Sequence, residues 1–354
     1  MLQVKDIEFN SASTEKSLAD KDTETKKKFD KKLVNDSLCS IPNFTLNIKE
    51  SILNNVDKII ILKKNEIDLD SYYETTLSKD LIIKFGPYYL QTFDKKNIHI
   101  PPDNFIIKHN FTPKLRTRMV DWMLEIFNIY DSDENTFFAA VKIMDKFFWK
   151  CCKPISNKSI HIIGVGCIYI ASKAYDLCPI TMKDIIDNIV HNVFTEKKIK
   201  DIEQIILKTI NFDIMQPTAS EFIQFLLYDL YMVNKSTIKK FRLKNIIDIV
   251  ENCAMWIAKM CCHFEKYSSK LPTHIALVSL LIGYEMVKDN KKLESNEKQF
   301  FVDWLEFLFE KTGNNGENKK KIDLLYQDVY KTFYKFKKME YKNLMKYHEL
   351  YFDE

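Results

Sequence analysis

Glycine is scarce in this sequence, with 6 among 354 residues. None of the six lies in a GxGxxG or GxxxxGK[ST] pattern, so the chain has no sequence for the loops that hold nucleotide phosphates. No constellation of nucleophile, base and phosphate loop is present either, and we expect no enzymatic activity. Few glycines and 9 prolines also favour long helices joined by short turns over a turn-rich sheet fold.

Arginine is scarce as well. Only three of the 53 basic residues are arginines, namely Arg116, Arg118 and Arg242. Against them stand 49 acidic residues, which leaves a net charge of +4. A dedicated nucleic-acid binder carries a larger basic excess and uses arginine to read phosphate and guanine. Nucleic acid is therefore not an expected partner, and the basic stretch from Lys311 to Lys346 is interpreted as the solvated face of a helix.

The 8 cysteines form no CxxC motif, and no two of the 7 histidines are spaced three or four residues apart. We therefore expect reduced thiols, no metal site and no cofactor. The sequence contains no uncharged apolar run of 18 residues, and its start, MLQVKDIEFNSASTEK, lacks an apolar signal segment. This predicts a protein of the nucleus and cytoplasm without a membrane span, and KKKFDKK at 26–32 could serve nuclear import.

What the sequence does contain is typical of a globular protein, with 46% hydrophobic and 29% charged residues. Its length favours two domains plus a tail. The expected parts are a disordered tail (1–43), an extension with a short helix near Tyr88 (44–111), two helical bundles (112–214 and 215–345) and a C-terminal tail (346–354).

The first bundle is predicted to contain five helices, because apolar residues recur there at spacings of three and four. The third of these helices is apolar nearly all round but too short to span a bilayer, which indicates a central core helix. Gly164 and Gly166 within it suggest that neighbouring helices approach closely. The expected helices span 113–130, 133–150, 160–174, 182–190 and 196–210.

A second series of helices is predicted to begin at a capping box formed by Thr218 and Glu221. Aligning His161 with His274 places HIIGVGCIYIASKAYD over HIALVSLLIGYEMVKD, which suggests a similar central helix in each half. Chance similarity of two apolar helices is the alternative. The expected second set spans 218–233, 236–262, 272–288, 294–310 and 320–340.

Several motifs occur in an order that is similar to that of the cyclin family. They are LRTRMVDW (115–122), IMDKFF (143–148), IASKAYD (170–176), LKTINFDIMQPTASEF (207–222) and KYSSKLPTHIALVSL (266–280). The ending YKNLMKYHEL (341–350) resembles that of mitotic A- and B-type cyclins. The resemblance covers about 85 to 350 and implies an all-α fold of two tandem five-helix cyclin boxes.

The resemblance implies a regulatory subunit that binds and activates a cyclin-dependent serine/threonine kinase and controls cell division, in mitosis. It maps two kinase-binding residues onto Lys173 and Glu203, whose charges suit free carbonyls and amides at a helix end. Without the resemblance, Lys173 could simply extend into solvent and Glu203 could belong to a solvated face. Further expected kinase contacts are Tyr175, Asp176, Tyr89 and Phe93.

Many cyclins also dock Arg-x-Leu peptides on the first helix, and this chain keeps the apolar and acidic character of that patch. The expected patch residues are Leu115, Met119, Trp122, Glu125 and Ile160. Arg118 and His161 depart from the family, because they place cationic groups in a site that receives the basic residue of the peptide. Core packing explains the apolar stripe equally well.

The resemblance also predicts a structural ion pair between Arg116 and Asp145. The alternatives are that Arg116 is a free surface residue or that Asp121 competes for it.

Two functional alternatives remain: a cyclin for a transcription-associated kinase, and a cyclin-fold transcription factor or adaptor without a kinase. The second would require a zinc ribbon and a basic DNA-facing surface, which the sequence lacks. No arginine precedes Arg116 and no Lys-Glu-Asn triplet occurs, so the destruction signals of mitotic cyclins are missing. The kinase and the stage of action cannot be read from the sequence.

Overall fold

The computed structural model describes residues 100–241, 243–290, 295–311, 316–336 and 343–344. These residues belong to one compact unit, 89–354. The predicted tails, the N-terminal helix near Tyr88 and the expected contact residues Tyr89 and Phe93 lie outside the described residues.

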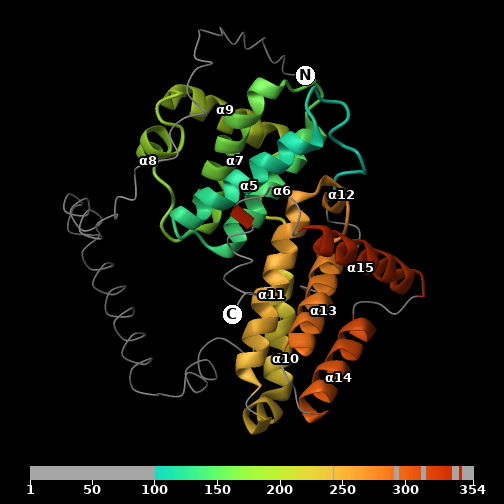
Figure 1. The fold of residues 1–354 in the computed structure, drawn as a ribbon. Coiled ribbons are helices and arrows are strands. Elements are labelled where there is room, and N and C mark those ends of the chain that lie inside the picture. Colours follow the sequence, from blue (N-terminus) through green and yellow to red (C-terminus); the bar gives the residue numbers. More distant parts are fainter. Residues whose placement is uncertain (1–99, 242, 291–294, 312–315, 337–342, 345–354) are drawn as a thin grey trace, which may run out of the picture. The chain divides into compact units, whose positions relative to one another are not determined.

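The described residues form helices and contain no strand, only an isolated bridge between Asn110 and Ser156, so the predicted all-α fold class is confirmed. The helices follow one another in two sets (Figure 1). The first set consists of α5 (Pro113–Ile129), α6 (Glu134–Lys150), the 3₁₀ turn η1 (Asn157–Ser159), α7 (Ile160–Tyr175), α8 (Met182–Asp184) and α9 (Glu196–Thr209). The second set consists of α10 (Ala219–Phe241), α11 (Lys244–His263), α12 (Glu265–Ser268), α13 (Pro272–Asn290), α14 (Ser295–Lys311) and α15 (Gly316–Phe336).

Threonine side chains start these helices where the sequence predicts them. Thr112, Thr181 and Thr195 each accept a hydrogen bond from the backbone amide three residues further on. At the start of α10, the amide of Thr218 donates to the carboxylate of Glu221, and the amide of Glu221 donates back to the hydroxyl of Thr218. This reciprocal pair is the predicted capping box.

The structure differs from the prediction in three places. Asn234 (φ −115°, ψ 20°) is a non-helical kink inside α10, next to the helix end predicted at 233, but the helix predicted over 236–262 is divided, and α11 begins only at Lys244. The fourth helix of the first set is one turn of α8 followed by a π-helix, η2 (Ile185–Ile189). The short helix α12 between α11 and α13 was not predicted.

Helix α7 occupies the core of the first set, as its apolar composition predicts. Val165 and Cys167 have no exposed surface, and α7 packs against α5, α6 and α9. A Cβ atom on Gly166 would lie 2.7 Å from Cδ1 of Ile206 on α9, and one on Gly164 would clash with the sulfur of Met119 on α5. Both glycines therefore allow the close approach that the sequence suggests.

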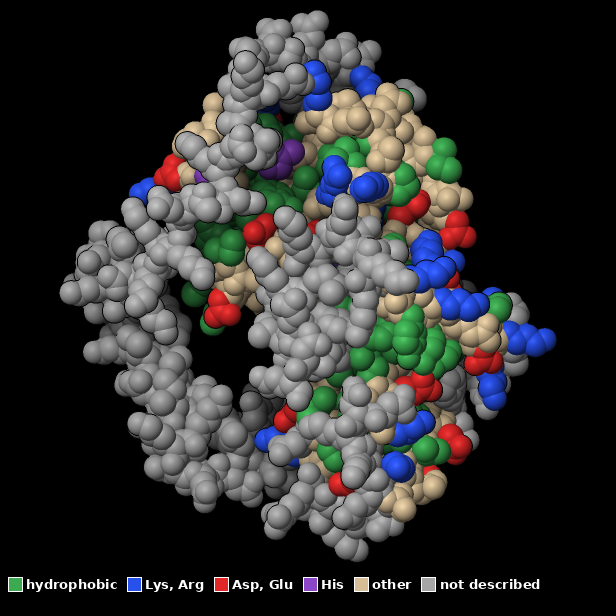
Figure 2. Space-filling model, viewed as in Figure 1, with side chains coloured by type: hydrophobic (Ala, Val, Ile, Leu, Met, Phe, Trp, Pro, Cys, Tyr) green, Lys and Arg blue, Asp and Glu red, His purple; other side chains and the backbone are tan. Residues whose placement is uncertain are grey.

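Helix α15 carries the basic face predicted near the C-terminus. Figure 2 shows Lys and Arg side chains gathered over this helix. Lys319, Lys320 and Lys321 are exposed, while Ile322 and Val329 are buried. The helix is thus amphipathic, with its lysines in solvent.

Candidate functional site

Lys173 and Glu203, the two residues that the cyclin resemblance selects, lie together at one end of the first set of helices. Lys173 is in the last turn of α7 and Glu203 is on α9, which packs along α7. The ammonium group of Lys173 donates a hydrogen bond to Oε1 of Glu203 and lies 3.8 Å from the ring centroid of Tyr169. The two side chains are 38% and 16% exposed, so both reach the surface.

The hydrogen bond between Lys173 and Glu203 could be replaced by bonds from each side chain to a partner protein. An ammonium group has three donors, of which Glu203 accepts one, and a carboxylate has a second oxygen with further accepting capacity. Partly exposed ion pairs contribute little to stability, because water solvates the separated charges well. A protein that offers backbone carbonyls to Lys173 and amides to Glu203 could therefore replace the internal bond at low cost.

Asp176, the residue after α7, has a different environment from the one expected of a kinase contact. Its carboxylate holds the end of α7 against the start of α6, and these bonds give it a structural role. The donors are the hydroxyls of Ser132, Thr136 and Ser172 and the amide of Asp133. Tyr175 is half-buried and packs against the core. Kinase contact by these two residues stays a prediction.

A partly exposed stripe runs along α5 where the docking patch is predicted. Leu115, Trp122 and Glu125 are half-buried, and Arg118 is exposed among them. The rings of Trp122 and His161 form a T-shaped pair, with a centroid distance of 5.0 Å. These residues therefore offer a surface, whereas the other two expected members do not. Met119 and Ile160 are buried, at 9% and 1% exposed.

His161 does not add the positive charge expected of it. It lies between Trp122 and Phe194, and this burial lowers the pKa of its imidazole below the usual 6.5. The side chain is therefore neutral at neutral pH, because the charged form is the one that burial disfavours. Arg118 remains as the cationic departure within the stripe.

Asn343 and Leu344 contact α5 beside this stripe, and the sequence did not indicate this contact. The side-chain amide of Asn343 donates to Glu125 at 3.3 Å and to Asp121 at 3.2 Å, and the amide of Leu344 donates to Asp121. His263 lies 3.3 Å from the same Asp121 carboxylate. Burial raises the pKa of Asp121, but these hydrogen bonds, led by the one from His263, outweigh it and hold the pKa below its usual value.

Arg116 and Asp145 form a doubly hydrogen-bonded ion pair between α5 and α6, at 2.7 and 2.6 Å. The guanidinium has no exposed surface and also donates to the carbonyls of Cys262 and His263 at the end of α11. It therefore joins the two sets of helices. The alternatives of a free surface arginine or a pair with Asp121 do not apply.

Two other classes of site have no support in the part of the chain that the structure describes. No group of three or more His, Cys, Asp or Glu side chains there could hold a metal ion. None of the helices there has both the length and the apolar character needed to cross a membrane.

Comparison with known proteins agrees with the motifs. Residues 88–215 match the family model described as the cyclin, N-terminal domain. Cyclin-A3-4 of Arabidopsis thaliana is 28% identical over 139 residues, which are 38% of this chain and 37% of that protein. G2/mitotic-specific cyclin-B2 of Homo sapiens is 22% identical over 50% of this chain and 43% of that protein. For G2/mitotic-specific cyclin-A of Patella vulgata the identity is 22%, over 71% and 56% respectively.

A solved structure, a viral cyclin from herpesvirus saimiri, aligns with 66% of this chain and 97% of its own length. Its sequence identity is 16% and the TM-score is 0.46.

The described helices and the pattern of motifs are thus similar to those of cyclins, as the sequence predicts. Residues 88–215 match the cyclin N-terminal domain, and A- and B-type cyclins are among the proteins that the chain resembles. The chain spans about two fifths of the length of the first curated relatives it matches.

Proposed function

We propose that this chain is the regulatory subunit of a cyclin-dependent protein kinase, with no phosphotransferase activity of its own. The observation that carries the proposal is the surface position of Lys173 and Glu203 on two helices of the matched cyclin domain. Their positive and negative groups lie side by side, as binding to the carbonyls and amides at the end of a partner helix requires.

In the proposed complex, the end of α7 and the adjoining face of α9 contact the kinase helix that carries a catalytic glutamate. Contact would hold that helix inward, so that its glutamate pairs with the lysine of the ATP site and the activation loop is reordered. The bond between Lys173 and Glu203 would open, and each side chain would bind the kinase backbone instead. Activation is thus a shift of the kinase between two conformations.

We further propose that the complex acts in cell-cycle progression, in mitosis, in the nucleus and cytoplasm. Two observations support this. Several relatives are named G2/mitotic-specific cyclins, and the stretch YKNLMKYHEL (341–350) resembles the ending of mitotic cyclins. A partly exposed stripe on α5 could add docking of substrate peptides. A transcription-associated kinase is the closest alternative partner, and the identity of the kinase distinguishes the two.

The test begins with affinity purification of the full chain from dividing cells and identification of the kinase that co-purifies. Binding to that kinase is then measured for Lys173→Ala, Glu203→Ala and the double variant. Losing a hydrogen-bonded charge at an interface typically costs about 2–5 kcal/mol, so we expect roughly 30-fold to several thousand-fold weaker binding. The double variant should lose less than the sum, because both residues hold one segment.

A matched control lies on the same helix α9. Glu196 and Lys200 form an ion pair at 2.6 Å with both side chains more than half exposed, and their alanine variants should bind the kinase normally. The charge swap Lys173→Glu with Glu203→Lys preserves an internal pair but offers the wrong charges, and should not bind. Normal affinity in the swap or in the double variant would exclude this pair as the kinase contact. If no kinase co-purifies, the adaptor alternative replaces the proposal.

A further inference from the structure

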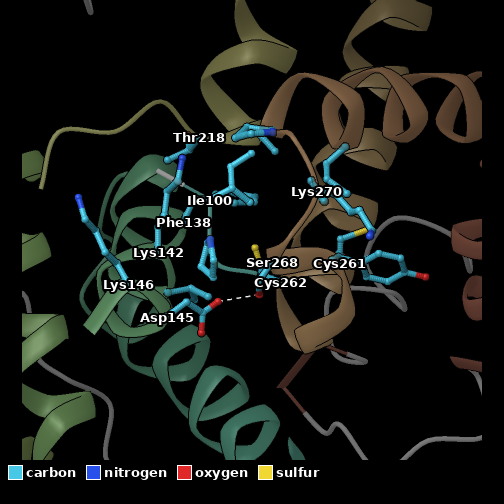
Figure 3. A pocket seen from close by; sticks show the side chains of 17 residues that line it. Ile100, Phe138, Lys142, Asp145, Lys146, Thr218, Cys261, Cys262, Ser268 and Lys270 are labelled. Carbon is cyan, nitrogen blue, oxygen red and sulfur yellow. Dashed lines mark hydrogen bonds between the residues drawn. The ribbon is translucent and has the colours of Figure 1, made fainter. Parts of the chain in front are cut away.

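A pocket lies where α6 of the first set meets α10, α11 and α13 of the second (Figure 3). It contains about 670 Å³ of empty space, a volume that includes the open solvent at its mouth. Much of its wall is apolar. The apolar lining residues are Ile100, Pro101, Phe138, Val141, Ala219, Ala258, Pro272 and Ile275.

Most charged groups of the wall already have a partner of opposite charge. Asp145 is bound by Arg116, Lys146 forms an ion pair with Asp213, and Lys270 lies 3.4 Å from Asp103. Lys142 is the exception. Among the described residues it forms no ion pair, and its ammonium group donates to the carbonyl of Pro217, so two N–H groups remain for a ligand.

The carboxylates of Glu221 and Asp213 lie near enough to favour the charged form of Lys142, but each of them is hydrogen-bonded to another group. The carboxylate of Glu221 on α10 is engaged by the amide and hydroxyl of Thr218. Asp213 is bound to Lys146, the like-charged neighbour of Lys142 on α6. Burial raises the pKa of the Cys262 thiol on α11 to about 12, so that this group is uncharged at neutral pH.

Two helices add to the positive potential. Ala219 and Pro272 in the pocket wall are the first residues of α10 and α13, and the amino-terminal end of a helix attracts negative charge. The pocket therefore combines apolar walls with an ammonium group that, among the described residues, has no carboxylate bound directly to it.

We propose that this pocket binds a small amphipathic carboxylate, such as a medium-chain fatty acid, with its carboxylate on Lys142 and its apolar body among Phe138, Val141 and Ala258. A single available ammonium group matches a monoanion. A phosphate dianion would need a second cation, and the guanidinium of Arg116 is committed to Asp145 and to backbone carbonyls. A neutral apolar ligand would leave Lys142 desolvated without compensation.

Such a ligand would contact both sets of helices, because Lys142 is on α6 whereas Ala258 and Ile275 are on α11 and α13. It would bind the folded chain only, and would therefore stabilise the folded chain by mass action. Neither Lys173 nor Glu203 lines the pocket, and the inference does not rest on kinase binding.

The experiment measures binding of decanoate to the full chain by titration calorimetry at pH 7, with decan-1-ol as the uncharged analogue. We expect decanoate to bind and Lys142→Met to weaken it roughly tenfold or more, the usual effect of losing one charge-assisted hydrogen bond. Ala258→Phe, which fills the pocket, should abolish binding. Lys158→Met, at an exposed lysine of η1, is the matched control and should bind normally.

The pH dependence of decanoate binding is a second test, and it needs no pocket-filling variant. Loss of hydration lowers the pKa of Lys142 to about 8, so the free site loses its charge above that pH. Decanoate should therefore bind progressively more weakly to the wild-type chain as the pH rises from 7 to 9.5, and the Lys142→Met variant should lack that trend. The proposal is overturned if decanoate does not bind, binds no better than decan-1-ol, or binds equally well to Lys142→Met.

Discussion

At the scale of single residues, Arg116 makes the most consequential contacts in the structure. It is fully buried, and its guanidinium bonds both oxygens of Asp145, two carbonyls at the end of α11 and the hydroxyl of Ser268. Burial disfavours the charge on arginine, but Asp145 outweighs this and keeps the pKa of Arg116 above its usual value. The residue is therefore charged at all physiological pH values.

We expect Arg116→Ala to lower the free energy of unfolding by about 3–5 kcal/mol, because it leaves Asp145 as a buried, unpaired charge. Chemical denaturation monitored by circular dichroism measures this change. The control is Arg118→Ala, two residues along the same helix and exposed, which should change stability by less than about 0.5 kcal/mol. Equal effects of the two variants would contradict the structural role of Arg116.

Some contacts of individual side chains could be predicted from the sequence, whereas others could not. The Arg116–Asp145 pair and the position of Lys173 beside Glu203 followed from motifs of the cyclin family, not from any local rule. The bonds of Asn343 to Asp121 join residues 222 positions apart, and no periodicity or motif connects them. The neutral state of His161 depends on burial between two aromatic rings, which only the folded structure shows.

At the scale of elements, the close packing of α7 on α9 sets the positions of Lys173 and Glu203. The two helices approach closely at Gly166, because a Cβ atom there would meet Cδ1 of Ile206 at 2.7 Å and Cγ2 of Ile202 at 3.2 Å. A larger residue at this point would push α9 away from α7 and separate the two charged residues.

We expect Gly166→Ala and Ile206→Val to compensate one another, since the second removes the Cδ1 atom that the first would contact. Ile206→Val alone should cost about 0.5–1.5 kcal/mol of unfolding free energy. In the Gly166→Ala background its cost should be smaller by about 0.5 kcal/mol or more. A double-mutant cycle measured by denaturation tests this, and strictly additive changes would mean that the helices relax freely around Gly166.

Helix order and most helix boundaries followed from the sequence, because apolar periodicity and threonine caps are local signals. The failures have local causes too. No Pro or Gly occurs between 236 and 262, so no residue of the sequence marks the point where the helix predicted there is divided between α10 and α11. The π-helix after α8 adds one residue to a turn, and no sequence pattern marks such an insertion.

At the scale of the whole unit, the two sets of helices share one continuous cluster of buried side chains. Their junction is also polar. Arg116 bonds the end of α11, Lys259 on α11 pairs with Glu134 at 2.7 Å, and Lys142 bonds the segment before α10. The pocket at this junction draws its wall from residues between Ile100 and Ile275, so it could not be predicted before the fold was known.

The desolvated Lys142 gives the free energy of unfolding a pH dependence whose sign can be derived. Its pKa is about 8 in the folded chain and near 10.5 when unfolded. Between these values the unfolded chain binds more protons, so the contribution of Lys142 to stability rises with pH, by at most about 1.4 kcal/mol per pH unit. The cost of burying the charged ammonium group is therefore present in full below pH 8, and it disappears above pH 10.5, where both states are neutral.

Other groups oppose this trend, and the prediction is therefore made for a difference between variants. Burial raises the pKa of Cys262 to about 12 and also raises that of Tyr267, so the folded chain retains these protons and loses stability as the pH rises above 9. These terms are shared by the wild type and Lys142→Met and cancel in the difference, apart from the electrostatic effect of Lys142 on Cys262. Measured from pH 7 to 10 without ligand, the wild type should gain stability relative to Lys142→Met. The exposed control Lys158→Met should show no such drift, and a flat difference for Lys142→Met would mean that its ammonium group stays hydrated in the folded chain.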